Sequence, residues 1–143
     1  MIRKLLLPVL LIGGIVSHAA GQNLKASAVP TVVKTALVKK YPNSTKVLWE
    51  KEDGNYEANW GGRSGEDNSV LFTPAGTFIE IVNTIPVSQL PAKVGPYIKD
   101  HYKGAKILEA GKVTDANGTL TYEAEIKGTA LIFDTSGNFL KKD

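Results

Sequence analysis

Few residues in this 143-residue chain have the types and spacing that catalysis needs. The sequence contains no cysteine and two histidines, so a thiol nucleophile, a disulfide and a zinc–thiolate site are all excluded. His18 lies in an N-terminal segment that we expect to be removed, and His101 lies beside Asp100 and Tyr102 on a predicted helix. A single histidine on a helix is more often an ordinary surface or partly buried side chain than a catalytic base. We therefore expect His101 to have no catalytic role.

The serine residues form no recognisable nucleophile motif. There is no Gly-x-Ser-x-Gly elbow, and no Ser-x-x-Lys accompanied by the other motifs of the enzymes that use it. Ser64 lies in the stretch Gly61-Gly62-Arg63-Ser64-Gly65, which lacks the Lys-Ser/Thr ending of a phosphate-binding loop. A turn that requires glycine explains this stretch better. The sequence predicts no catalytic residue, no cofactor and no enzyme activity.

Two acidic stretches are the candidates for calcium binding, at 50–53 and at 115–118. A calcium loop needs several oxygen ligands at fixed alternating positions, closed by a carboxylate, and neither stretch supplies that pattern. Hairpin turns explain both stretches, because each contains or precedes a glycine of the kind found in tight turns. We therefore expect no metal site.

The net charge gives no indication of a nucleic-acid partner. The chain has 17 basic and 14 acidic residues, and removal of Arg3 and Lys4 leaves 15 basic residues against 14 acidic ones. A protein that binds phosphate backbones usually shows a strongly basic patch or stripe. We expect no binding of nucleic acid.

Residues 1–21 have the composition of a secretory signal peptide. The basic pair Arg3-Lys4 precedes an apolar run at 5–16, and small residues follow that suit a signal peptidase, with cleavage after Ala19 or after Gly21. A membrane span needs roughly 20 apolar residues, and this run is shorter and interrupted by proline and glycine. We predict an exported protein without a membrane anchor, located in the periplasm or, as an alternative, secreted.

The rest of the chain contains two copies of one pattern. Three groups of residues recur in the same order: Val29-Pro30, Val33, Tyr41 and Val47 as Leu90-Pro91, Val94, Tyr102 and Ile107, then Tyr56-Glu57-Ala58 as Tyr122-Glu123-Ala124, and finally 71–78 as 132–139. A shared order is much harder to obtain by chance than single matches. We predict that residues 22–143 form one domain made of two repeats, at about 27–85 and 86–143.

Each repeat begins with helical spacing and continues with strands. Apolar positions in 33–41 and 90–102 predict one helix each, with Ser88 as the N-cap of the second helix and a kink or break at Gly95-Pro96. Four strands follow each helix: 46–51, 56–60, 69–73 and 77–82, and then 106–113, 119–127, 130–134 and 138–141. Short turns between them predict an antiparallel meander. The result is an α+β fold in which two tandem helix-plus-four-strand units form one sheet, with helices on one face.

Six short motifs extend over nearly all of this region: Val29-Pro30-x-x-Val33, Lys40-Tyr41-Pro42-Asn43, Val47-x-Trp49-Glu50-Lys51, Gly54-x-Tyr56-Glu57-Ala58, Val70-Leu71-Phe72-x-x-x-Gly76 and Ile85-Pro86-x-x-x-Leu90-Pro91. Each motif is weak alone, but the combination resembles the PepSY-like periplasmic proteins, whose fold is similar to that of the β-lactamase inhibitor protein. The resemblance implies a periplasmic protein with a tandem helix-and-sheet fold. It does not imply inhibition of a β-lactamase, because a fold does not fix a function.

Alternation along the strands divides the side chains between the two faces of the predicted sheet. Large aromatic side chains are expected in the core beneath the helices: Trp49, Tyr56, Trp60, Phe72, Tyr122 and Phe133. Nine residues are expected to point away from the helices and to bind a protein: Leu48, Glu50, Glu57, Asn59, Leu71, Leu108, Glu123, Glu125 and Ile132. Such a face is often merely solvated, but its Leu and Ile content favours an interaction surface.

The function that these observations favour is non-catalytic binding. We expect an exported monomer in a protein–protein or inhibitor-like role, whose partner is another periplasmic or envelope protein. The alternative is an envelope structural protein or a carrier of a small ligand. If the sheet face is not the binding surface, the polar loop at 61–67 is the next candidate.

Overall fold

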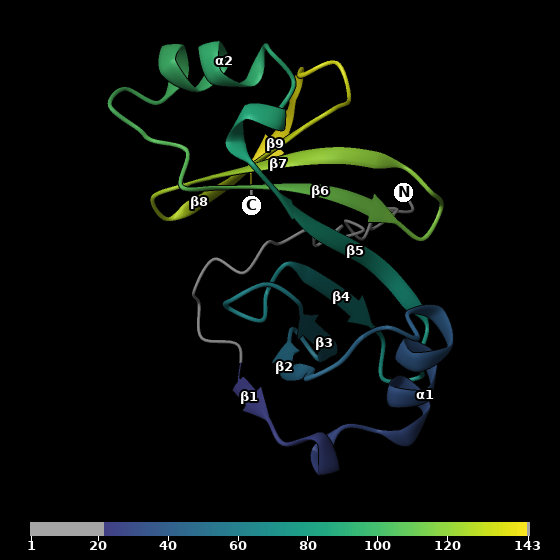
Figure 1. Cartoon of the computed structure of the whole chain (residues 1–143). Helices are drawn as coiled ribbons and strands as arrows, with labels where there is room; N and C mark the ends of the chain where they lie inside the picture. The colour runs from purple at the N-terminus through teal and green to yellow at the C-terminus, as the bar shows by residue number, and fades with distance from the viewer. Residues whose placement is uncertain (1–21, 143) are drawn as a thin grey trace, which may run out of the picture.

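The strands pair in the order in which they follow one another along the chain (Figure 1). The structure is a computed structural model that describes residues 22–142, so the predicted signal peptide lies outside the described residues. Every neighbouring pair is antiparallel, which makes one nine-stranded sheet. The strands are β1 (Gln22–Leu24), β2 (Leu48–Glu52), β3 (Asn55–Trp60), β4 (Asn68–Phe72), β5 (Phe78–Ile85), β6 (Glu109–Asp115), β7 (Leu120–Ile126), β8 (Thr129–Phe133) and β9 (Phe139–Lys142).

Both halves of the chain have the same order of elements. A short 3-10 helix, η1 (Ala26–Ala28) or η2 (Val87–Gln89), precedes an α-helix, α1 (Thr31–Lys40) or α2 (Val94–His101), and four strands follow. The predicted α+β class, the single antiparallel sheet and the two helices are therefore confirmed. Strand β1, at the edge of the sheet beside β2, was not predicted. Within residues 22–142 no helix is both long and apolar enough to cross a membrane.

The second helix begins later than its sequence pattern predicts. Ser88 lies in η2, and the N-cap of α2 is Lys93, without a side-chain hydrogen bond, so the prediction that Ser88 is the N-cap was wrong. Pro96 is the third residue of α2. The first backbone N–H groups of a helix have no partner within it, so a proline there loses no hydrogen bond. The predicted break is thus a helix start just before Pro96.

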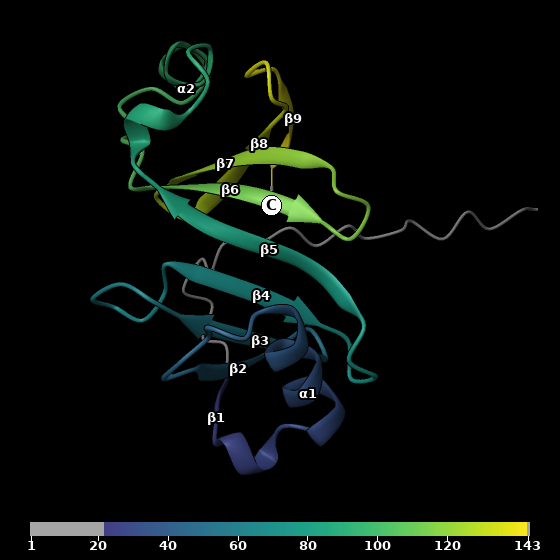
Figure 2. The same cartoon turned by 45° about the vertical axis from the view of Figure 1, so that its right-hand side comes forward.

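Both helices pack on the same face of the sheet. Val33 and Leu37 of α1 pack against a cluster on β2, β3 and β4 that contains Trp49, Tyr56, Ala58, Val70 and Phe72. Val94 and Ile98 of α2 pack against a cluster on β7 and β8 that contains Ala124, Ile126, Leu131 and Phe133. The strand register links the two clusters across β5 and β6 to one face. Figures 1 and 2 show α1 beside the β2–β4 end and α2 beside the other end.

A glycine turn holds each helix close to the sheet. Gly76 and Gly137 have φ angles of 81° and 83°, in the left-handed region that favours glycine. A Cβ atom at Gly76 would lie 3.0 Å from the carbonyl oxygen of Val32, and one at Gly137 would lie 3.0 Å from Pro91. The turn before the last strand of each half therefore packs tightly against the segment that starts the helix.

Candidate functional site

Seven of the chain's eight glutamates lie in strands, and all seven point to the sheet face opposite the helices. They are Glu50, Glu52, Glu57, Glu80, Glu109, Glu123 and Glu125. The register shows this directly, because Glu50 lies opposite Glu57 and Glu109 lies opposite Glu125. Directly paired residues of neighbouring strands share a face. We call this surface the glutamate face.

The lysines of the strands lie mostly on the other side of the sheet. Lys51, Lys112 and Lys142 pair with Tyr56, Tyr122 and Leu131, which belong to the helix-covered face. Within residues 22–142, Lys141 is the one strand lysine on the glutamate face, where it pairs with Ile132. A chain of nearly balanced charge therefore has its strand carboxylates on one face and most of its strand ammonium groups on the other.

The predicted side-chain directions are correct for eight of the nine residues, but the predicted open face is wrong at five of them. Leu48 is 51% exposed, and Glu50 and Glu125 are partly buried. Five are buried, Glu57, Asn59, Leu71, Glu123 and Ile132, with Glu57 4% and Glu123 0% exposed. These five lie on β3, β4, β7 and β8, which have a strand on each side. Each of the five has cross-strand neighbours about 5 Å away on both sides, and because Glu50 and Glu125 have them too, paired neighbours alone do not bury a residue.

Leu108 was predicted within a strand, and it lies just before one. Strand β6 begins one residue later, and its residues opposite Glu123 and Glu125 are Gly111 and Glu109. The backbone N–H of Leu108 donates a hydrogen bond to the carbonyl oxygen of Glu125 at 2.7 Å, and its side chain is 57% exposed. Leu108 therefore precedes the strand and lies at the edge of the glutamate face.

Glu57 is the centre of a small hydrogen-bonded group. The Ser69 Oγ contacts both the Glu57 Oε1 and the Asn59 Oδ1. A hydroxyl has one hydrogen to donate, so one of the two contacts needs another donor, which is either a protonated Glu57 or the amide nitrogen of Asn59. The Glu52 carboxylate places a further negative charge near Glu57.

Burial and neighbouring charge favour a protonated Glu57. Burial raises the pKa of Glu57 to about 7, and the carboxylates of Glu52, Glu50 and Glu66 add to the increase, against the opposing effect of the Ser69 hydrogen bond. The pKa of Glu52 is also raised, first by burial and then by the charges of Asp53 and Glu50. The β2–β3 part of the glutamate face therefore changes its charge near neutral pH.

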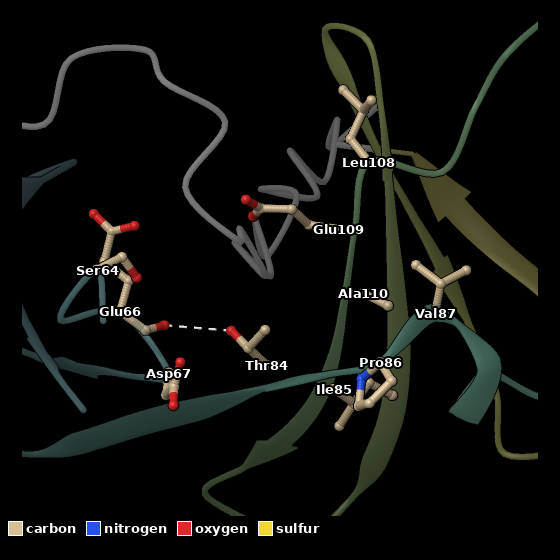
Figure 3. Close-up of a pocket in the computed structure, with 10 residues that line it drawn as sticks. All are labelled: Ser64, Glu66, Asp67, Thr84, Ile85, Pro86, Val87, Leu108, Glu109 and Ala110. Carbon is tan, nitrogen blue, oxygen red and sulfur yellow. Dashed lines mark hydrogen bonds between the residues drawn. The ribbon is translucent and has the colours of Figure 1, made fainter. Parts of the chain in front are cut away.

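A pocket of about 270 Å³ opens at the edge of the glutamate face (Figure 3). It lies where the β3–β4 loop meets the end of β5 and the start of β6. Its lining consists of Ser64, Glu66, Asp67, Thr84, Ile85, Pro86, Val87, Leu108, Glu109 and Ala110. Thr84 fixes the loop to β5, because its backbone N–H donates to the Asp67 carbonyl oxygen at 2.9 Å and its hydroxyl donates to the Glu66 carbonyl oxygen at 3.3 Å.

The other candidates from the sequence have structural explanations. His101 is exposed, its ring stacks on Tyr97 with centroids 4.0 Å apart, and its Nδ1 lies 2.9 Å from the Tyr97 carbonyl oxygen. The Asp115 carboxylate accepts hydrogen bonds from the backbone N–H groups of Asn117 and Thr119, which closes the β6–β7 turn. Among residues 22–142 no three His, Cys, Asp or Glu side chains are placed to hold a metal ion.

Three of the seven glutamates were missed by sequence reasoning: Glu52, Glu80 and Glu109. Glu52 has the same strand parity as Glu50, so alternation alone is enough to find it. Glu80 and Glu109 depend on a bulge and on a strand boundary, which the sequence pattern does not show.

Residues 18–80 and 63–141 each match a family provisionally described as beta-lactamase-inhibitor-like and PepSY-like. A solved structure from Bacteroides eggerthii, provisionally described as a periplasmic protein, is 19% identical with a TM-score of 0.67, covering 80% of this chain and 88% of that one. A BLIP-like protein of Bacteroides fragilis is 19% identical with a TM-score of 0.60, covering 80% and 84%. No curated protein matches the chain. At this identity the solved structures show the fold, and the family match over most of the chain shows that it belongs to the PepSY-like family.

Proposed function

We propose that this protein is an exported, non-catalytic binding protein whose glutamate face holds a cationic segment of a partner protein. The observation that carries the proposal is the segregation of charge: seven glutamates point to one face, and one strand lysine of residues 22–142 accompanies them. Complementary charge across an interface accelerates association and disfavours partners of the wrong sign. A cationic partner is therefore the kind that this face selects.

The accessible residues of the nine are the direct contacts in this proposal. Leu48 and Leu108 are more than half exposed and supply apolar area, whereas Glu50 and Glu125 keep part of their surface and supply charge. The buried residues, Glu57, Asn59, Leu71, Glu123 and Ile132, form the layer beneath these contacts. Asn59, Leu71 and Ile132 act on a partner through packing, and Glu57 and Glu123 add to the negative field of the face when they are ionised.

The periplasm is the compartment that we propose for this interaction. Residues 1–21 have the pattern of a secretory signal, and the structural neighbour from Bacteroides eggerthii is provisionally described as periplasmic. An inhibitor-like role would be one form of this binding. Its target enzyme would then have to present a cationic surface to the glutamate face.

Retention of periplasmic proteins on the immobilised mature chain tests the proposal, with three variants that each change the charge by the same amount. Glu50→Lys and Glu125→Lys reverse charge on the glutamate face, whereas Asp100→Lys reverses it on the exposed side of α2. We expect the unaltered chain and Asp100→Lys to retain proteins that elute as the salt concentration rises. Glu50→Lys and Glu125→Lys should not retain these proteins.

The identity of the retained proteins is not the criterion, because the pattern across variants decides the outcome. Equal retention by all four chains would overturn the glutamate face as the binding surface. Thermal unfolding of each variant, measured beside the retention assay, shows whether a loss of binding reflects a loss of folding.

A further inference from the structure

The pocket at the edge of the glutamate face has one apolar wall and one acidic wall. Its apolar side is formed by Pro86 and Val87, from the segment that follows β5, because the paired residues Ile85 and Ala110 face the helices. The carboxylates of Glu66 and Asp67 come from the β3–β4 loop, and that of Glu109 comes from β6. Figure 3 shows the Glu109 side chain extending from β6 toward the loop that carries Ser64 and Glu66. Among the described residues that line the pocket there is no lysine or arginine.

The Asp67 carboxylate is engaged within its own loop. A Cβ atom at Gly62 would collide with an Asp67 carboxylate oxygen, so this carboxylate is folded against the Gly62 backbone. Glu66 and Glu109 are both exposed and approach the pocket from two different elements. These two carboxylates are therefore the groups available to a cation that enters from solvent.

The loop that forms the acidic wall is fixed in place before any ligand arrives. Gly61, Gly62 and Gly65 have φ angles of 88°, 67° and 82°, which define its shape, and Thr84 holds it to β5 with two hydrogen bonds. A Cβ atom at Gly65 would lie 3.3 Å from the Leu48 side chain, so the loop also contacts the exposed leucine of the glutamate face. The pocket is thus continuous with the surface proposed to bind the partner.

We propose that this pocket receives one lysine or arginine side chain of the cationic partner, and this inference rests on the function proposed above. The aliphatic stem lies along Pro86 and Val87, and the charged end lies between Glu66 and Glu109. Long basic side chains bury their methylene groups on apolar surface while the charge stays near water or a counter-charge. The volume of about 270 Å³ accommodates one such side chain.

Two other occupants fit the pocket less well. A metal ion would leave the apolar wall without a function, and within residues 22–142 no three acidic or histidine side chains are placed to hold one. An uncharged apolar group would contact the apolar residues, but it would leave the Glu66 and Glu109 carboxylates without a positive charge between them. The basic side chain is the occupant that uses both walls.

Titration of the mature protein with small probes, followed by backbone amide NMR, tests the inference. The probes are Nα-acetyl-lysine N-methylamide, the arginine equivalent, the norleucine equivalent and ammonium chloride at the same ionic strength. We expect the two basic probes to shift the amide signals of residues 64–67, Thr84 and Glu109. Norleucine lacks the charge and ammonium lacks the stem, so neither should shift this set.

Variants of the pocket sharpen the test. Glu109→Gln keeps the shape of the side chain and removes the charge, so the dissociation constant of the basic probes should rise roughly tenfold. Val87→Ser, on the apolar wall, should raise the dissociation constant of the basic probes by a smaller factor. Asp100→Asn is the matched control, because it removes an exposed carboxylate outside the pocket, and it should leave the probes unaffected.

The outcomes separate this inference from the function on which it rests. If no basic probe shifts the pocket signals, while Glu50→Lys still abolishes retention of periplasmic proteins, the pocket inference is wrong and the glutamate face stands. If the probes bind in the pocket and retention is insensitive to Glu50 and Glu125, the pocket stands and the wider surface does not. Equal binding of norleucine and lysine would overturn the role of the carboxylates.

Discussion

The two halves of the sheet carry the same Tyr-Glu-Ala segment in different surroundings. Glu57 on β3 lies opposite Glu50 and Leu71, whereas Glu123 on β7 lies opposite Gly111 and Ile132. Leu71 and Ile132 are both apolar, whereas Glu50 carries a carboxylate and Gly111 has no side chain. The same position therefore faces a like charge in one half only.

The helix-covered face shows no such divergence. Ala58 and Ala124 are both fully buried, and a register shift falls after Leu71 in one half and after the equivalent Ile132 in the other. The C-caps of the helices, Tyr41 and Tyr102, have nearly identical backbone angles, with φ of −130° and −131°. The repeated pattern therefore specifies the core, whereas the glutamate face differs between the halves.

The largest expected effect tests whether the two cores are equivalent. Phe72 and Phe133 are both almost fully buried beneath a helix, so Phe72→Ala and Phe133→Ala should each lower the free energy of unfolding by about 3–5 kcal/mol. Urea unfolding followed by tryptophan fluorescence and by circular dichroism measures both losses. A large loss in one half alone would break the equivalence of the cores.

The next effect concerns the charge of Glu57. The pKa of Glu57 is about 7 in the folded chain, whereas the reference value for an unperturbed glutamate is 4.5. Between these two pH values the folded state therefore binds more protons than the unfolded state. The free energy of unfolding therefore falls as the pH rises through this window, by up to about 3 kcal/mol. Glu57→Gln cannot ionise, and it should be more stable than the unaltered chain at pH 8 by a similar amount.

Urea unfolding at pH 4.5, 6 and 8 checks this prediction. The difference between Glu57→Gln and the unaltered chain should be close to zero at pH 4.5 and greatest at pH 8. Asp100→Asn, at an exposed position, is the matched control for the loss of one carboxyl group. A constant difference across the three pH values would show that burial does not keep Glu57 protonated.

A smaller effect distinguishes two reasons for glycine in the turns, which are the positive φ angle and the lack of space for a side chain. Gly137 and Gly118 have similar φ angles, 83° and 80°, but a Cβ atom would meet Pro91 and Lys93 only at Gly137. Gly118→Ala should cost about 1 kcal/mol for the backbone angle alone. Gly137→Ala should cost more, because the turn must also move away from the start of α2. Equal losses in thermal unfolding would remove the close approach as a reason for this glycine.

Local patterns predict the fold well and the glutamate face only in part. The two helices and eight strands follow from spacing and turn glycines, which act over a few residues. Strand β1 has three residues, and its pairing with β2 spans more than twenty positions, so no local pattern indicates it. Burial of Glu57 likewise depends on Leu71 and Ser69 of another strand.

Alternation along a strand assigns some residues to the wrong face of the sheet, and the cause is similar. Alternation from Phe78, which packs with the α1 core, would place Glu80 under the helix. The irregular register opposite Leu71 and Phe72 reverses the side and brings Glu80 to the glutamate face. Likewise, the exposed Leu108 suggests an earlier start for β6 than the observed Glu109. A bulge and a strand boundary change which face a residue occupies, and neither has a clear sequence signature here.

The smallest expected effect comes from a substitution that removes the difference in charge between the two halves, at the residue opposite Glu57. Glu50→Gln removes the carboxylate that lies opposite Glu57, where the second half has a glycine. Because the Glu50 charge raises the pKa of Glu57, this variant should lower that pKa, but only by a fraction of the total increase, since burial is the larger cause. Carbon-13 NMR titration of the Glu57 carboxyl measures the midpoint directly. Ser69→Ala is the opposing control, because it removes the hydrogen bond that lowers the pKa and should move the midpoint upward. If both variants left the midpoint in place, burial alone would set the charge of Glu57, and the contrast between Glu50 and Gly111 would have no electrostatic consequence.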